Sequence, residues 1–159
     1  MYRSRRWYLV TLGTAGLTVL SGCLGGNVVE REVLEPNRDS REAECETDTL
    51  IDESFHLQPR WSPVGTTGQE WPIELVAGDV IRLSIFWWGE RGRVMPLPDL
   101  RVTDPEENTI LDESGYSTNH HEVAIERTGT HTLDVQNRDR SEGGEWKLEL
   151  FWYSDAQCM

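Results

Sequence analysis

The fold class is decided in residues 71–87, whose sequence is WPIELVAGDVIRLSIFW. Apolar side chains occupy every second position on both sides of Ala77-Gly78-Asp79, a tripeptide typical of turns. Alternation with a period of two places one face of a strand in a core and the other face in water. This stretch therefore predicts two strands joined by a tight turn.

The same alternation recurs in short segments further along the chain, separated by Gly, Asp, Asn and Pro residues. The alternating apolar positions are Phe55 and Leu57, Leu100 and Val102, Val123 and Ile125, Leu133 and Val135, and Trp146, Leu148, Leu150 and Trp152. No long segment has apolar residues at helical spacing. We predict an all-β domain over residues 50–159, an antiparallel jelly-roll-like β-sandwich of seven or eight strands.

Three segments, in order, resemble a known group of sandwiches. Residues 74–83 place a Gly-Asp turn between two strands, residues 100–105 form a strand ending in Asp-Pro, and residues 129–137 form a Gly-initiated strand ending in Asn. Together they resemble the GOLD-type domains and the pre-peptidase C-terminal domains of secreted bacterial and archaeal enzymes, although His131 stands where Tyr is usual. Both families are non-catalytic, so the resemblance implies an interaction or accessory role.

The N-terminal residues have the features of an export signal. Arg3, Arg5 and Arg6 precede a short apolar run that ends in Leu20-Ser21-Gly22-Cys23, which matches a bacterial-type lipobox. The Arg5-Arg6 pair resembles the twin-arginine export motif. We predict that residues 1–22 are a signal peptide and that Cys23 becomes a lipid-modified first residue. Export by the Sec route and an uncleaved transmembrane anchor are the alternatives.

Residues 23–49 combine the lipidated Cys with a segment rich in acidic side chains, interrupted by Gly25-Gly26 and Pro36. Few apolar side chains are available there to offset the entropy of ordering the backbone. We predict a flexible tether with a reach of at most ~85 Å, which would hold the domain clear of lipid headgroups. A short amphipathic helix over residues 28–34 is the alternative.

The chain is strongly acidic, with 28 Asp plus Glu against 15 Lys plus Arg. Its net charge falls from −13 to −16 once the three arginines of residues 1–22 are removed, and Lys147 is its only lysine. This charge excludes nucleic acid as a partner. Acid excess with almost no lysine resembles proteins of salt-loving archaea, an acidic protein of an ordinary bacterium being the alternative.

Catalytic signatures are absent from the sequence: there is no Gly-x-Ser-x-Gly elbow, His-Glu-x-x-His motif, P-loop or dinucleotide fingerprint. His120-His121 resembles half a metal site, but neighbours on a strand point to opposite faces, so both could bind one ion only from a turn. We interpret them as solvated loop residues. We predict that the protein is not an enzyme and binds no cofactor. Calcium is the one candidate ligand, through carboxylates clustered in the sequence at Asp99, Asp104, Glu106 and Glu107.

Tryptophan is abundant, and Trp87-Trp88 closes a predicted strand just before a loop with Arg91 and Arg93. Exposed aromatic rings beside Arg suit sugar or protein recognition. We predict a binding surface at Trp88, Arg91 and Arg93, the alternative being that the rings fill the core and its ends. The protein is then a lipid-anchored binding or accessory module for an extracellular protein or glycan, on the outer face of the cytoplasmic membrane. A structural subunit of a cell-envelope or transporter-associated assembly is the second reading.

Lipidation of Cys23 leaves Cys45 and Cys158, one before the first predicted strand of the domain and one after the last. Disulfides persist in exported chains, and the termini of a domain often lie close together. We predict a Cys45–Cys158 disulfide that stabilises the fold by up to ~4.7 kcal/mol in a chain-entropy description. Free or intermolecularly paired thiols are the alternative.

The lipobox gives the first testable prediction. Mass spectrometry of protein taken from its own membrane is expected to show a chain that begins at lipid-modified Cys23, and Cys23→Ser is expected to release the protein or leave the uncleaved precursor. An intact N-terminal segment of residues 1–22, or an unmodified Cys23, would contradict this.

Overall fold

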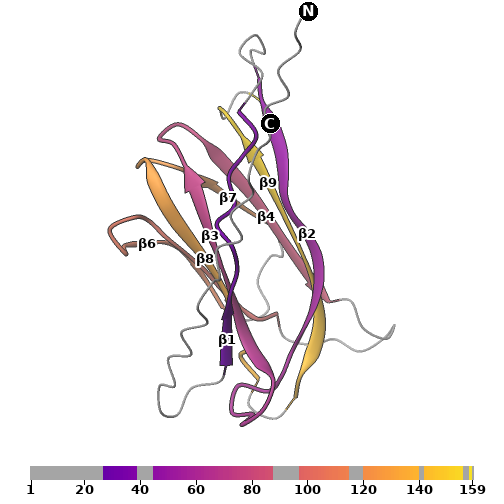
Figure 1. The fold of residues 1–159 in the computed structure, drawn as a ribbon. Coiled ribbons are helices and arrows are strands. Elements are labelled where there is room, and N and C mark those ends of the chain that lie inside the picture. Colours follow the sequence, from indigo (N-terminus) through magenta and orange to yellow (C-terminus); the bar gives the residue numbers. More distant parts are fainter. Residues whose placement is uncertain are drawn as a thin grey trace, which may run out of the picture.

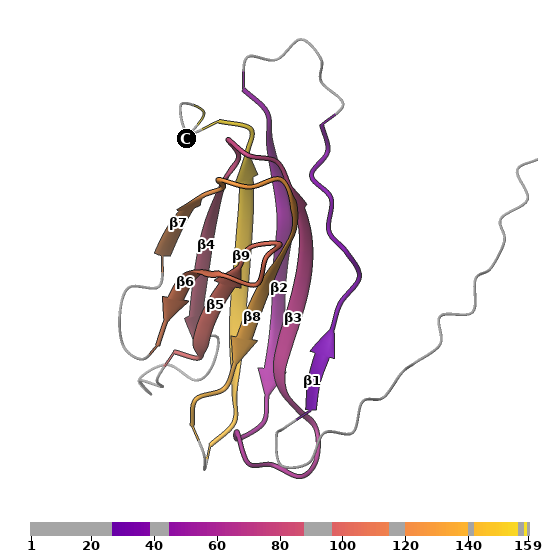
Figure 2. The same ribbon diagram turned by 90° about the vertical axis from the view of Figure 1, so that its left-hand side faces the viewer.

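The computed structural model describes residues 27–38, 45–87, 97–114, 120–139, 142–155 and 158. These residues form two facing sheets (Figures 1 and 2). The strands are β1 (Asn27–Glu30), β2 (Thr47–Leu57), β3 (Thr66–Leu75), β4 (Val80–Trp87), β5 (Asp99–Thr103), β6 (Thr109–Glu113), β7 (His120–Ala124), β8 (Gly129–Gln136) and β9 (Gly144–Tyr153). Across the described part of the chain there is no helix with the length and apolar character of a membrane span.

The strand order confirms the predicted sandwich. One sheet, which we name sheet A, has the order β1-β3-β8-β5-β6, and the other, sheet B, has the order β2-β9-β4-β7. Without β1, the remaining eight strands make two four-stranded antiparallel sheets in the order of a jelly roll. The predicted strands all form, and β1 is an addition that the sequence pattern does not predict.

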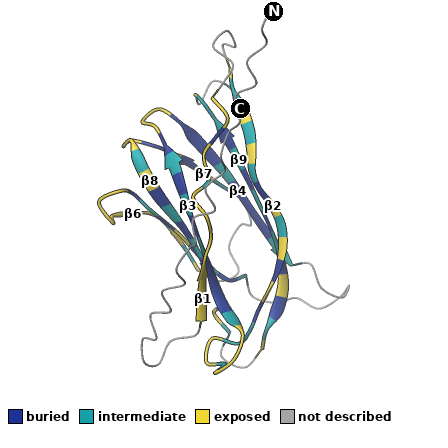
Figure 3. Cartoon of the chain, viewed as in Figure 1, coloured by how far each residue is buried: buried dark blue, intermediate teal, exposed yellow. Residues whose placement is uncertain are grey.

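The core lies between the two sheets and is filled by the alternating positions of the strands (Figure 3). Trp146 and Trp152 of β9 are both 0% exposed, and Trp71 of β3 is also buried. The view that the tryptophan rings fill the core is therefore confirmed for these three residues. Trp87 packs against the core edge-on to Trp146, with 5.5 Å between the ring centroids. Gly144 is required beside them, because a Cβ there would collide with both rings.

The turn between β3 and β4 is fixed by Gly78 and Asp79. Gly78 has a φ of 102°, a backbone conformation that favours glycine. The Asp79 side chain is 3% exposed and accepts a hydrogen bond from the Val76 N–H at 2.7 Å. Two backbone bonds of 2.8 Å, from Gly78 N–H to the Ile125 carbonyl and from Ile125 N–H to the Asp79 carbonyl, join this turn to the chain after β7.

The prediction of a flexible tether is wrong for residues 27–38, which lie along the outer edge of β3. β1 pairs with β3 in parallel, and the pairing resumes at Leu34, whose N–H donates to the Pro72 carbonyl at 2.8 Å and whose carbonyl accepts from the Glu74 N–H at 2.9 Å. Pro72 has no N–H of its own, which accounts for the gap between the two paired stretches. The alternative helix over residues 28–34 is also wrong.

The C-terminal end of this segment is held by a charge pair. Arg38 donates to both carboxylate oxygens of Asp79, at 3.1 and 2.6 Å, and its guanidinium carbon lies 4.7 Å from the centroid of the Trp152 ring. Residues 27–38 are therefore fixed to the sandwich at both ends, despite their acidic and weakly apolar composition. We name them the N-terminal strap.

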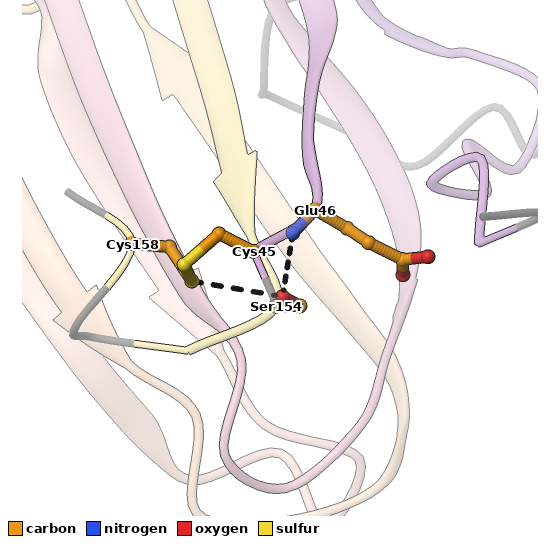
Figure 4. The surroundings of a disulfide bond; sticks show 4 residues. All are labelled: Cys45, Glu46, Ser154 and Cys158. Carbon is orange, nitrogen blue, oxygen red and sulfur yellow. Dashed lines mark hydrogen bonds between the residues drawn. A yellow bond between two sulfur atoms is a disulfide. The ribbon is translucent and has the colours of Figure 1, made fainter. Parts of the chain in front are cut away.

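The predicted disulfide is present and joins the start of β2 to the residues after β9 (Figure 4). The Cα atoms of Cys45 and Cys158 are 5.2 Å apart. Ser154 lies beside the bridge: its Oγ accepts from the Glu46 N–H at 3.0 Å, and its N–H donates to the Glu46 carbonyl at 2.9 Å. The bond closes the sandwich where its first and last long strands, β2 and β9, pair.

Removal of the Arg38 side chain provides a test of the strap. Arg38→Ala leaves the buried Asp79 carboxylate without its ion-pair partner, so we expect the free energy of unfolding to fall by about 2 kcal/mol. A fully buried pair would cost more, but the Arg38 side chain is 35% exposed. Urea denaturation at constant salt measures the change.

The matched control is Arg101→Ala, because Arg101 pairs with Asp112 at 3.4 Å on an open strand face where both side chains are about half exposed. Its removal is expected to cost less than ~1 kcal/mol. Equal losses for the two variants would contradict the role assigned to Arg38.

Candidate binding surface

The outer face of sheet B carries aromatic and cationic side chains side by side. In β9 the core positions alternate with partly exposed residues. In β4 Arg82 and Phe86 are partly exposed, and Ser84 between them is buried. The outward positions hold three rings, two cations and the residues between them: Arg82, Ser84 and Phe86 from β4, and Lys147, Glu149, Phe151 and Tyr153 from β9. We name Phe86, Phe151, Tyr153, Arg82 and Lys147 the aromatic face.

Strand register brings each cation to a ring. Lys147 lies opposite Phe86 in the β4–β9 pair, with its Nζ 5.9 Å from the ring centroid. Arg82 lies opposite Phe151, and its guanidinium carbon is 5.6 Å from the centroid of the Tyr153 ring. These contacts occur on paired strands, which hold side chains more precisely than loops do.

Carboxylates on the same strand or on a neighbouring strand hold the two cations in place. Lys147 Nζ lies 2.8 Å from Asp52 of β2 and 2.7 Å from Glu149. The hydrogen bonds that Lys147 donates to Asp52 and then to Glu149 raise the pKa of Lys147 above its ordinary value, so it stays charged at neutral pH. Arg82 pairs with Glu122 of β7 at 3.7 Å. The face is thus a fixed pattern of rings and paired charges.

A shallow hollow of about 290 Å³ adjoins this face and is lined by Arg82, His120, His121 and Glu122. Both histidines lie in β7, so the interpretation as loop residues is wrong. His120 Nδ1 is 2.8 Å from Ser84 Oγ, whereas His121 Nδ1 is 3.9 Å from the Glu113 carboxylate in sheet A. Their different partners fit the expectation that the two side chains point to opposite faces.

The structure does not bring the proposed calcium ligands together. Asp99 begins β5 and Asp104 follows its last residue, so the two carboxylates lie at opposite ends of that strand. Asp104 Oδ1 accepts from the N–H groups of Glu106 and Asn108 at 2.9 and 2.8 Å. The hydrogen bond from the Asn108 side chain holds the pKa of Asp104 below its ordinary value. Within the described ranges no group of three His, Cys, Asp or Glu side chains is placed to hold a metal ion.

A second electrostatic feature lies on the outer face of sheet A. Asp134 of β8 is flanked in register by Glu70 of β3 and Arg101 of β5. Burial, and then the charge of Glu70, raise the pKa of Asp134 to about 6. Gln136 donates a hydrogen bond of 3.0 Å to one carboxylate oxygen. Asp134 is therefore a carboxyl group whose ionised form the fold disfavours.

The residues predicted to bind a partner, Trp88, Arg91 and Arg93, lie outside the described residues, as does Cys23. The structure shows where the first three attach: they follow Trp87, the last residue of β4. The aromatic face was missed by sequence reasoning. Its signal was present, since Phe86, Phe151 and Tyr153 occupy the positions of β4 and β9 where a solvated strand usually carries polar residues.

No protein-family model matches the chain, and neither does any curated protein. Solved structures with a similar fold include PliG of Aeromonas hydrophila, a periplasmic lysozyme inhibitor of g-type lysozyme, with a TM-score of 0.46, 12% identity and coverage of 79% of this chain and 97% of that one. The pre-peptidase C-terminal domain of a Bacillus anthracis collagenase has a TM-score of 0.43, 14% identity and coverage of 79% and 95%. PliG of Salmonella Typhimurium, also a periplasmic lysozyme inhibitor of g-type lysozyme, has a TM-score of 0.43, 14% identity and coverage of 79% of this chain and 97% of that one.

These similarities are distant and concern the sandwich as a whole. A pre-peptidase C-terminal domain is among these distant matches, and no family model supports the predicted resemblance in sequence. At this distance the neighbours carry no information about a ligand of this chain.

Asp134 generates a prediction about pH. A carboxyl whose folded pKa lies near 6, against an ordinary 3.8, makes the protein less stable as pH rises from about 4 through 6. Asp134→Asn removes that penalty, so we expect it to stabilise the fold at pH 7.5 by roughly 1 kcal/mol, after allowance for solvent screening of a partly exposed group. The gain is expected to shrink towards pH 4.5.

Urea denaturation at the two pH values measures this effect. Asp112→Asn is the control, because Asp112 is exposed and paired with Arg101, and it is expected to give no gain at pH 7.5. Equal stability of wild type and Asp134→Asn at pH 7.5 would contradict the account of Asp134.

Proposed function

We propose that this protein is a non-catalytic binding module outside the cytoplasm, anchored to the outer face of the cytoplasmic membrane by a lipid on Cys23, and that it captures an extracellular protein or glycan through the aromatic face. The observation that carries the proposal is the placing of three partly exposed rings and the chain's only lysine on one face of one sheet.

The chemistry of the aromatic face suits recognition. Aromatic rings offer large contact areas and lose little rotamer freedom on binding. Lys147 is already held by Asp52 and Glu149, so a partner need not order it. The carboxylates around it also offer acceptors to hydroxyl or amide donors. A flat face that combines ring stacking with fixed polar groups fits a glycan chain or a protein surface.

Two further observations support a place outside the cytoplasm. The Cys45–Cys158 disulfide is a kind of bond that persists in oxidising compartments. The lipobox and the arginine-rich leader of residues 1–22 point to export.

At high salt the Debye length falls to roughly 3 Å, so long-range electrostatic attraction to a partner contributes little and short-range ring stacking has to dominate.

The proposal predicts that removing ring side chains from the aromatic face weakens binding. Phe86→Ala combined with Tyr153→Ala is expected to weaken capture of the partner about tenfold. Two ring contacts of about 0.7 kcal/mol each add up to about 1.4 kcal/mol, which corresponds to a tenfold change in affinity. Binding to extracellular glycans and to proteins of the same membrane is measured at the working salt concentration, with the lipid-anchored protein.

The matched control is Thr103→Ala with Thr132→Ala, two residues that pair on the outer face of sheet A. It is expected to bind like the wild type. Loss of binding in a Trp88→Ala, Arg91→Ala, Arg93→Ala variant, with the aromatic-face variant unaffected, would move the site to the loop after β4. A stoichiometric complex that both variants leave intact would favour the structural-subunit reading.

A further inference from the structure

The N-terminal strap fixes the position of the anchor relative to the sandwich. β1 runs parallel to β3 and begins with Asn27 opposite Thr66, the first residue of β3. The chain therefore reaches the domain at the end where β2 and β3 are connected. Cys23 precedes Asn27 by four residues, which span at most ~14 Å. A lipid on Cys23 would hold this end of the sandwich next to the membrane, instead of at the end of a long tether.

The same end exposes apolar side chains. Trp61 and Val64, in the connection between β2 and β3, are 68% and 69% exposed, the highest values among the large apolar residues in the described ranges. Val28 and Val29 of β1 are 41% and 40% exposed. We name these four residues the anchor-proximal patch. Figure 2 shows β1 and the β2–β3 connection at the same end of the sandwich.

The patch stands on an ordered base. Gln58 N–H donates to the Thr66 carbonyl at 2.7 Å, which closes the β2–β3 connection. Asn137 Nδ2 donates to the carbonyls of Gln58 and Glu142, both at 2.8 Å, and Arg60 N–H donates to the Asp139 carbonyl at 2.7 Å. The β2–β3 and β8–β9 connections thus brace each other, and the Trp61 ring is presented from a fixed backbone.

Charge is balanced within the two connections beside the patch. The described residues of the β2–β3 and β8–β9 connections carry Arg60 and Arg138 with Asp139 and Glu142. Asp99 and Glu113 add two carboxylates at the same end, at the start of β5 and the end of β6. The two connections are thus the part of this end that anionic headgroups repel least.

We propose that the anchor-proximal patch rests on the lipid surface, with the Trp61 ring at the boundary between headgroups and hydrocarbon, so that the sandwich stands on the membrane with its β3–β4 turn outward. Tryptophan favours that boundary because its ring is apolar and its N–H stays hydrated. The proposal rests on the proposed lipid anchor. It assigns a second membrane contact to the domain itself, in addition to the lipid on Cys23.

The experiment places a nitroxide at each end of the full, membrane-bound protein. Pro63→Cys lies between Trp61 and Val64, and Ala77→Cys lies in the exposed β3–β4 turn at the other end. Accessibility to oxygen, which concentrates in lipid, is compared with accessibility to a water-soluble nickel complex. The label at residue 63 is expected to meet oxygen at least several-fold more than nickel, and the label at residue 77 the reverse.

A Trp61→Ser, Val64→Ser double variant carrying the residue 63 label is expected to lose that preference. Its melting temperature is measured beside that of the wild type, and an intact fold makes the loss specific to lipid contact. An unchanged preference would overturn the role of the patch.

Mass spectrometry of Cys23 in the same samples separates the two proposals. A lipidated Cys23 with both labels in water overturns the membrane contact and leaves the anchored binding module standing. A residue 63 label shielded from both reagents shows that a protein covers this end and also overturns the contact. An unmodified Cys23 overturns both the anchor and the orientation.

Discussion

The arrangement of this chain depends on the buried carboxylate of Asp79. Its side chain joins Arg38 of the N-terminal strap to the β3–β4 turn, and its carbonyl holds the chain after β7. A carboxylate that is 3% exposed needs a countercharge, since an unpaired charge in that position is strongly destabilising. The Gly-Asp turn therefore requires Arg38, and Arg38 draws the strap along β3. One charge pair links the order of the N-terminal segment to the integrity of the sandwich.

Most of the sandwich could be predicted from the sequence, because the alternation of apolar and polar residues within each strand shows which face is buried. In β9 the core residues Trp146, Leu148, Leu150 and Trp152 alternate without interruption. The strap could not be predicted in this way. Its order comes from the open edge of β3 and from an ion pair between residues 41 positions apart, neither of which leaves a period in residues 27–38. Composition alone favoured disorder, and tertiary contacts overrode it.

The candidate sites show the same division between local and distant information. The disulfide could be predicted because only two cysteines remain after Cys23 and they flank the strands. The predicted calcium site does not form, because Asp99 and Asp104 are near one another in sequence but are separated by the length of β5. The aromatic face depends on register: only the pairing of β4 with β9 brings Lys147 to Phe86, and a pattern within one strand does not contain that pairing.

If Cys23 carries the proposed anchor, the strap would give the domain two mechanical states. While residues 27–38 are docked, a pull on a bound partner would reach the anchor through hydrogen bonds that lie side by side along β3 and share the load. If the strap peels away, the link from Cys23 to Cys45 becomes a free chain of roughly 75 Å, and the disulfide at Cys45 stops the unravelling before β2. Under force the domain would then lengthen its N-terminal linker while both sheets stay intact.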